Sequence, residues 1–234
     1  MTGELVNTVA VVIGSTIGLL FKKAISEKIT KAAMTAIALC TLYIGISGAL
    51  KGQNTLILIV SMLIGTIIGT IVNIDGGIEK LGSYIENRFA GKDGKVSVAQ
   101  GFVTASLLFC IGSMTIVGSL NAGLYGDNEL LFTKSLLDFI SAMMLSVSLG
   151  VGVLCSSAFV LVFQGALVLL SSLLAPVLTD AAIAEMTCAG SIMIIGLGLN
   201  LLGVTKLKVA NYLPALVIAP VVCWAAPYIS SIFA

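Results

Sequence analysis

Histidine is absent from this 234-residue chain, and charged residues make up only 10% of it. A soluble domain carries about a quarter charged residues. Here apolar residues reach 58% and the mean hydropathy is +1.14. Such a composition excludes a large soluble core and indicates a protein solvated by lipid.

Clustered cysteines and a strong net charge are also missing. The five cysteines stand singly within apolar runs, without a CxxC pair. With no histidine either, a metal or redox site has almost no ligands, so we expect no metal and no cofactor. The net charge of +1 gives no footprint for nucleic acid.

Two short motifs resemble those of intramembrane proteases but lack their partners. Gly45-Ile46-Ser47-Gly48 matches the GxSG of rhomboid-type serine proteases, whose serine needs a histidine base. Leu124-Tyr125-Gly126-Asp127 resembles part of the signature of intramembrane aspartyl proteases, but it falls in a predicted outer loop. The chain has no second aspartate in the middle of the membrane to share a proton with it. We therefore expect that the protein is not an enzyme.

What the chain does contain is apolar runs of about 18 to 22 residues, the length that crosses a hydrocarbon core of about 30 Å. The first run is followed by Lys22 and Lys23 and has no cleavage site, so it is predicted as a retained helix. The fold class predicted is an all-α polytopic bundle forming one transmembrane domain over 1–234. Its eight spans are 5–21, 30–50, 55–74, 98–120, 130–150, 153–174, 181–204 and 209–230.

The least certain division lies between 130 and 178, where no charged loop interrupts the apolar sequence. A single helix of that length would extend about 70 Å, so we predict a tight hairpin near Gly150, with seven spans in all as the alternative. The basic residues favour eight, because short cytoplasmic loops collect Lys and Arg. With both termini outside, ten of the twelve fall inside, and only Lys51 and Lys134 fall outside.

The longest loop, 75–97, places apolar residues at helical spacing between charged ones. This pattern predicts an amphipathic helix at the cytoplasmic interface. The alternative is a simple surface linker that ends in the turn Gly91-Lys92-Asp93-Gly94-Lys95.

Two stretches of the chain are related to each other. Cys110, Gly112, Ser113, Ile116 and Gly118 align without a gap with Cys188, Gly190, Ser191, Ile194 and Gly196. The opening of span two matches the region before span seven more weakly. Because the predicted spans four and seven run in opposite directions, this similarity suggests inverted repeats, which are typical of transporters. The alternative is convergent glycine-rich composition.

Small and polar residues within these stretches make broken helices possible. The residues in question are Gly112, Ser113, Thr115, Gly118, Ser119 and Asn121 in span four, and Gly196, Gly198 and Asn200 in span seven. Half-helix ends at such breaks point toward a bound ion or polar solute. For the glycines alone, close helix packing is the competing explanation.

Ionisable and amide side chains within apolar spans are the strongest individual signals, because they need partners there. Lys134 and Asp138 lie four apart on one helix face, with Ser135 nearby. They form either a pore-entrance or substrate-binding pair or a snorkelling pair at the interface. Gln164 lies in the middle of span six, and Asn211 lies near the inner end of span eight.

Several of these segments together resemble the bacterial membrane family known as domain of unknown function 554 (DUF554). They are 112–119, Gly126-Asp127, Lys134-Ser135 with Asp138, 149–153, Gln164-Gly165, 198–202 and 211–216. The family pattern often has proline where Ser113 stands, which bears on how sharply span four is broken. The resemblance implies a bacterial cytoplasmic membrane location and supplies no substrate.

The leading hypothesis is a carrier or channel that moves a small solute or ion across the bacterial inner membrane. A non-transporting scaffold or sensor acting through 75–97 is the alternative. Expected partners are the lipid bilayer, a small solute or ion, and a second copy of the chain docked through the glycine faces of spans one and three.

Overall fold

The fold is all-helical wherever the structure describes it. The structure is a computed structural model, and it describes residues 2–22, 27–89 and 97–232. Within these ranges there is no strand, which confirms the predicted all-α bundle. The helices are α1 (Thr2–Lys22), α2 (Glu27–Ala49), α3 (Thr55–Val72), α4 (Ile74–Phe89), α5 (Val98–Cys110), α6 (Ser113–Tyr125), α7 (Glu129–Leu149), α8 (Val151–Leu169), α9 (Ser171–Leu174), α10 (Asp180–Leu201), the 3-10 helix η1 (Val209–Tyr212) and α11 (Ala215–Ile232).

Five of these helices are long and apolar enough to cross a membrane, namely α1, α3, α7, α8 and α10. The bent pair formed by α5 and α6 makes a sixth candidate. The regions of α2 and α11 contain shorter apolar helices, Met34–Ala49 and Val209–Ala225. The chain is therefore a multi-pass membrane protein, and the prediction of eight spans requires α2 and α11 to cross as well.

The predicted break in span four occurs at Gly112. Helices α5 and α6 meet at an angle of 60°, and Gly112 between them has φ +152°, a conformation that L side chains rarely adopt. The Thr115 hydroxyl donates to the Phe109 carbonyl at 3.1 Å, which satisfies one backbone acceptor freed by the break. Helix α6 then continues unbroken through Gly118, Ser119 and Asn121.

The corresponding break proposed for span seven does not exist. Helix α10 runs without interruption from Asp180 to Leu201, through Gly196 and Gly198. The reason is packing, because the glycines of α10 admit side chains from neighbouring helices. Gly198 lies against Leu42 of α2, and Gly190 lies against Ile111 at the end of α5. The two related stretches therefore meet in space, although only one of them is broken.

Glycines also set the register of three helix pairs. Gly14 and Gly18 of α1 lie against Phe139 and Met143 of α7, so this pair is parallel. The pairs α2–α10 and α3–α11 are antiparallel, as shown by the contacts Gly45–Ile195 and Gly52–Cys188 and by Gly65–Ala215 and Gly69–Asn211. These relative directions agree with the eight-span orientation predicted from the basic residues.

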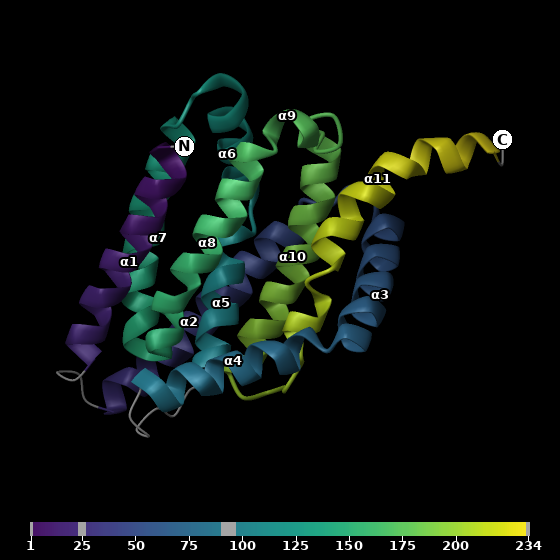
Figure 1. Ribbon diagram of the computed structural model, residues 1–234. Helices are drawn as coiled ribbons and strands as arrows, with labels where there is room; N and C mark the ends of the chain where they lie inside the picture. The colour runs from purple at the N-terminus through teal and green to yellow at the C-terminus, as the bar shows by residue number, and fades with distance from the viewer. Residues whose placement is uncertain (1, 23–26, 90–96, 233–234) are drawn as a thin grey trace.

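The arrangement of the ends follows from these directions. Figure 1 shows both termini at one end of the bundle, while α4 lies across the opposite end. The turn between α7 and α8 is a single residue, Gly150, with φ +77°. Among the described residues the buried apolar core forms three clusters. One lies around α5, α6, α10 and η1, another lies around α1, α5, α7 and α8, and a small one consists of Ala122, Leu131 and Val168.

Candidate functional site

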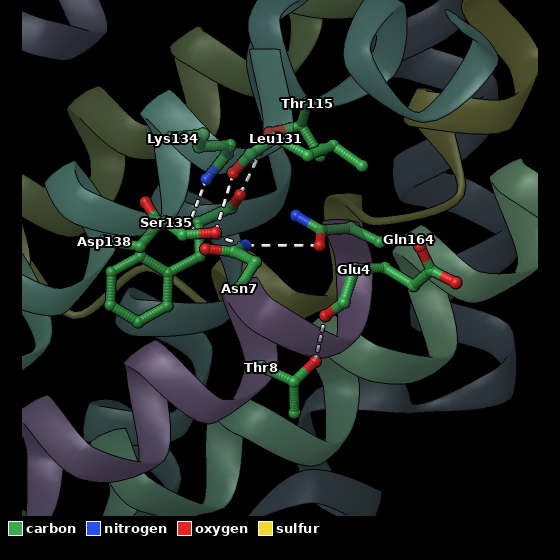
Figure 2. Close-up of polar contacts among 10 residues, drawn as sticks. Glu4, Asn7, Thr8, Thr115, Leu131, Lys134, Ser135, Asp138 and Gln164 are labelled. Carbon is green, nitrogen blue, oxygen red and sulfur yellow. Dashed lines mark hydrogen bonds and ion pairs between the residues drawn. The ribbon is translucent and has the colours of Figure 1, made fainter. Parts of the chain in front are cut away.

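A chain of buried polar side chains from three helices lies inside the bundle. The Asn7 amide nitrogen on α1 donates to the Asp138 carboxylate on α7 at 3.0 Å. The same nitrogen donates to the Gln164 carbonyl oxygen on α8 at 3.2 Å. Asn7 and Gln164 are 0% exposed and Asp138 is 6% exposed. We call Asn7, Lys134, Asp138 and Gln164 the interior cluster (Figure 2).

Lys134 completes this cluster through an ion pair with Asp138, four residues further along α7. Both side chains are only 8% exposed. A snorkelling pair would extend its charged groups to the interface, whereas these groups are enclosed by α1 and α8. Of the two alternatives for this pair, the burial therefore disfavours the interfacial one.

The parallel packing of α1 on α7 explains how these residues come together. At the start of the pair, the Gly3 backbone N–H donates to the Asn128 side-chain oxygen at 3.0 Å. Further along, a Cβ at Gly14 would lie 2.3 Å from the Phe139 carbonyl oxygen, so only glycine permits this approach. The close spacing allows the short Asn7 side chain to reach Asp138.

Helix α1 contributes a polar face that was not among the predicted site residues. Glu4, Asn7, Val11 and Ser15 are all 0% exposed and recur at helical spacing, so they form one buried face of the helix. The signal was available in this spacing, but the predicted span began at Leu5 and left Glu4 outside. Figure 2 shows Glu4 beside Gln164, with the Thr8 hydroxyl donating to the Glu4 backbone carbonyl at 2.7 Å.

Two atoms of the interior cluster are not satisfied by the described part of the chain. The Asn7 side-chain oxygen and the Gln164 side-chain nitrogen are buried and have no hydrogen-bond partner there. Buried polar groups are nearly always hydrogen-bonded to protein or water. The cluster therefore retains one acceptor and one donor position for water or a small polar solute.

The other predicted site residues of α6 and α7 make contacts mainly within and between these two helices. Ser135 donates to the Leu131 carbonyl of its own helix at 2.7 Å, and Thr115 supports the break as described above. Ser119 is fully buried, while Gly118 lies against Leu130 and Leu131. The backbone carbonyl of Asn121 accepts from Asp127 N–H at 3.3 Å and so closes the end of α6. The Ser113 side chain lies outside the described residues.

The remaining predicted residues, Asn200, Asn211 and Gly196, belong to another place at the α4 end of the bundle. Asn200 holds the loop after α10, donating to the Leu207 carbonyl at 2.8 Å and accepting from Leu207 N–H at 2.8 Å. Asn211 accepts from the Asp75 backbone N–H at 2.9 Å. Gly196 lies against Leu207. The structure therefore separates these three residues from the interior cluster.

The fold and the interior cluster define the class: this is a polytopic α-helical membrane protein with an ionisable polar site inside its helical bundle. The chain belongs to the family described as protein of unknown function (DUF554), which matches residues 2–224. That range contains every residue of the interior cluster.

Two curated relatives align over almost the whole chain. One is the uncharacterized membrane protein YdfK of Bacillus subtilis (strain 168), 34% identical over 226 residues, which covers 95% of each chain. The other is the uncharacterized protein YqgA of Escherichia coli (strain K12), 31% identical over 220 residues, which covers 93% of this chain and 94% of the relative. No solved structure shows a significant match.

Proposed function

We propose that this protein is a transporter, a carrier or a channel, that moves a small polar solute or ion across the bacterial cytoplasmic membrane. The observation that carries the proposal is the interior cluster, in which α1, α7 and α8 join an ion pair to two amides inside a membrane bundle. The excess of basic residues in the predicted inner loops supports an orientation with both termini outside.

The cost of burying these groups supports a functional role. A charged side chain within the bilayer costs several kcal/mol unless it is paired or hydrated, and such residues mark ion or substrate pathways in many membrane proteins. Lys134 and Asp138 neutralise each other, yet apolar residues would pack here at lower cost. Retention of the pair is therefore best explained by a task that needs polar groups.

The break between α5 and α6 supports the same proposal. Discontinuous helices within a membrane expose backbone ends that bind ions and polar groups in transporters. The N-terminus of α6 follows Gly112 directly and has no side-chain cap. In the proposed mechanism, the solute interacts with the unsatisfied amide atoms of Asn7 and Gln164, while the Lys134–Asp138 pair opens and reforms as it passes.

The test uses purified full-length protein in proteoliposomes and measures the uptake of isotope-labelled Na⁺, K⁺, Cl⁻, acetate and amino acids in turn. We expect flux of at least one of these, lost in Asp138→Asn and reduced in Gln164→Leu. Thr133→Val is the matched control, because Thr133 is exposed on the same helix as Asp138. Native flux in both cluster variants would contradict the site, and single-channel currents would distinguish a channel from a carrier.

A scaffold or sensor acting through 75–97 is the second candidate, favoured by the position of α4. This helix lies across the end of the bundle and presents the exposed side chains of Glu79, Lys80 and Tyr84. Replacing these three with alanine leaves the interior cluster intact. Both variants are tested for their ability to complement a strain in which the gene is deleted. If the triple alanine variant fails to complement while Asp138→Asn complements, the scaffold is favoured over the transporter.

A further inference from the structure

A second polar site lies at the α4 end of the molecule, apart from the interior cluster. A pocket of ≈ 480 Å³ is enclosed by α4, the start of α5, the end of α10 and the loop 203–208. Its polar lining includes the amides of Gln100 and Asn200 and the hydroxyl residues Ser97 and Thr205. No residue of the interior cluster lines it.

The pocket is lined by charges of both signs, which come from two separate segments of the chain. Asp75 and Glu79 come from adjacent turns of α4, whereas Lys206 and Lys208 come from the loop after α10. In the described part of the chain, no salt bridge joins the two carboxylates to the two ammonium groups. Burial, followed by the neighbouring Glu79 carboxylate, raises the pKa of Asp75 above its ordinary value, and Lys208 opposes this shift. The Glu79 carboxylate thus lies close enough to disfavour the charge of Asp75.

The walls of the pocket are held in place by specific contacts. Asn200 binds both backbone groups of Leu207 and accepts from the Thr205 hydroxyl at 2.7 Å, which fixes the lysine-bearing loop. On the other side, Gly82 lets α4 approach the Ala99 backbone closely. The fold therefore holds the backbones that carry these charges, while the side chains of Glu79, Lys206 and Lys208 are exposed.

We propose that this pocket binds a zwitterion, whose ammonium group lies between Asp75 and Glu79 and whose anionic group lies at Lys206 and Lys208. A simple cation or anion would interact favourably with one wall and leave the charges of the other wall unpaired. A molecule with both charges pairs with each wall and leaves no net charge behind. This inference concerns a separate site and does not rest on the proposed transport function.

Two sources supply such a group, a free amino acid and the ethanolamine headgroup of a phospholipid. The structure offers a place for the lipid chains, because an apolar groove of ≈ 460 Å³ lies on the other side of the same α4–α5 contact. Ile78 and Ala99 line both the pocket and the groove. Phe102, Phe159 and Val162 complete an apolar wall suited to an acyl chain.

The experiment measures binding to the full-length protein in detergent by calorimetry and by the shift of its unfolding midpoint. The soluble probes are two zwitterions, glycerophosphoethanolamine and L-alanine, and two ions that carry charge of one sign only, ethanolamine and inorganic phosphate. Nanodiscs of phosphatidylethanolamine or phosphatidylglycerol form the lipid arm. We expect a zwitterion to bind at least about tenfold more tightly than either single charge, which corresponds to one charge-assisted contact.

Two double variants and one control complete the design. Asp75→Asn with Glu79→Gln, and Lys206→Gln with Lys208→Gln, should each weaken zwitterion binding by about tenfold or more. Lys51→Gln with Glu129→Gln removes exposed charges elsewhere in the chain and should leave binding unchanged. Selective binding of L-alanine identifies a free solute, and selective stabilisation by phosphatidylethanolamine identifies a lipid. Absence of saturable binding would overturn the proposal. So would phosphate binding as tight as zwitterion binding, with an affinity that does not change in Asp75→Asn with Glu79→Gln.

Discussion

Gly190 of α10 lies directly against Ile111, the residue at which α5 ends. A Cβ placed on Gly190 would be 2.4 Å from a methyl carbon of Ile111. The end of the broken helix is thus seated on the middle of an unbroken one, at a position where only a hydrogen atom fits. This contact lies beside the buried cluster around α5, α6 and α10.

Substitution of Gly190 tests the importance of that contact. Gly190→Ala should lower the free energy of unfolding by about 1–3 kcal/mol, because the added methyl overpacks the site. Ile111→Ala should largely rescue it by making room. Gly165→Ala serves as the control, since a Cβ there meets nothing within 4 Å. The free energy of unfolding is measured in mixed detergent micelles for the native protein, Gly190→Ala, Gly190→Ala with Ile111→Ala, and Gly165→Ala. Equal losses in Gly190→Ala and Gly165→Ala would contradict the packing argument.

The link between α1 and the interior cluster makes a second prediction. Asn7→Leu removes the donor shared by Asp138 and Gln164, so we expect a loss of about 1–3 kcal/mol in stability. Gln164→Leu removes the other amide. If the two amides act as a pair, the double variant should lose less than the sum of the singles, by about 0.5–3 kcal/mol. Strictly additive losses in a thermodynamic cycle would show that the pair is not coupled.

A third prediction concerns the turn between α2 and α3. One oxygen of the Glu185 carboxylate accepts from the backbone N–H groups of Gln53 and Asn54, both at 2.7 Å, and Glu185 is 2% exposed. Glu185→Ala should therefore destabilise the protein by about 1–3 kcal/mol and open this turn to protease. Gln53→Ala keeps the backbone donors and should have little effect. A protease-resistant turn in Glu185→Ala would contradict this role.

The fourth prediction is a pH dependence at Asp75, measured without added ligand. Burial, followed by Glu79, raises the pKa of this carboxyl above its ordinary value of 3.8. The folded protein then holds the proton more tightly than the unfolded chain. The contribution of this proton to the free energy of unfolding is fully present below the ordinary pKa of Asp75. It is lost as the pH rises through the raised pKa of the folded protein.

Asp75→Asn removes this titration while preserving the shape of the side chain. At neutral pH the variant should unfold at a higher temperature than the native protein, and the difference should vanish as the pH falls below 3.8. Thermal scans across this pH range provide the measurement. A difference that does not change with pH would show that ionisation of Asp75 has no part in it.

The sequence predicted the architecture well because its signals there are strong. Apolar runs are long, and the one-sided distribution of lysines identified two helices around Gly150 even without a charged loop. The glycine faces of spans one and three were interpreted as packing or dimer surfaces. In the structure they pack within the chain, against α7 and α11, so a homodimer would require other surfaces.

The site was predicted less completely, for physical reasons. Sequence alone does not distinguish an asparagine that faces a pathway from one that braces a loop, as Asn200 does. Nor does a glycine-rich string reveal whether the helix breaks: the chain breaks at Gly112, where φ is +152°, whereas Gly190 stays helical and packs against Ile111. Asn7 was missed because its importance depends on α7, a helix far along the chain.

That distance has a consequence for biogenesis. Gly3 and Asn128, which join the start of α1 to the start of α7, are 125 positions apart in the sequence. During synthesis, the first helix therefore enters the bilayer long before its parallel partner exists. Its polar face must be sheltered by the insertion machinery or by provisional contacts until α7 arrives. Truncated chains that end before Glu129 should consequently be unstable and short-lived in the membrane, even though they contain α1, α2, α3 and the α5–α6 pair.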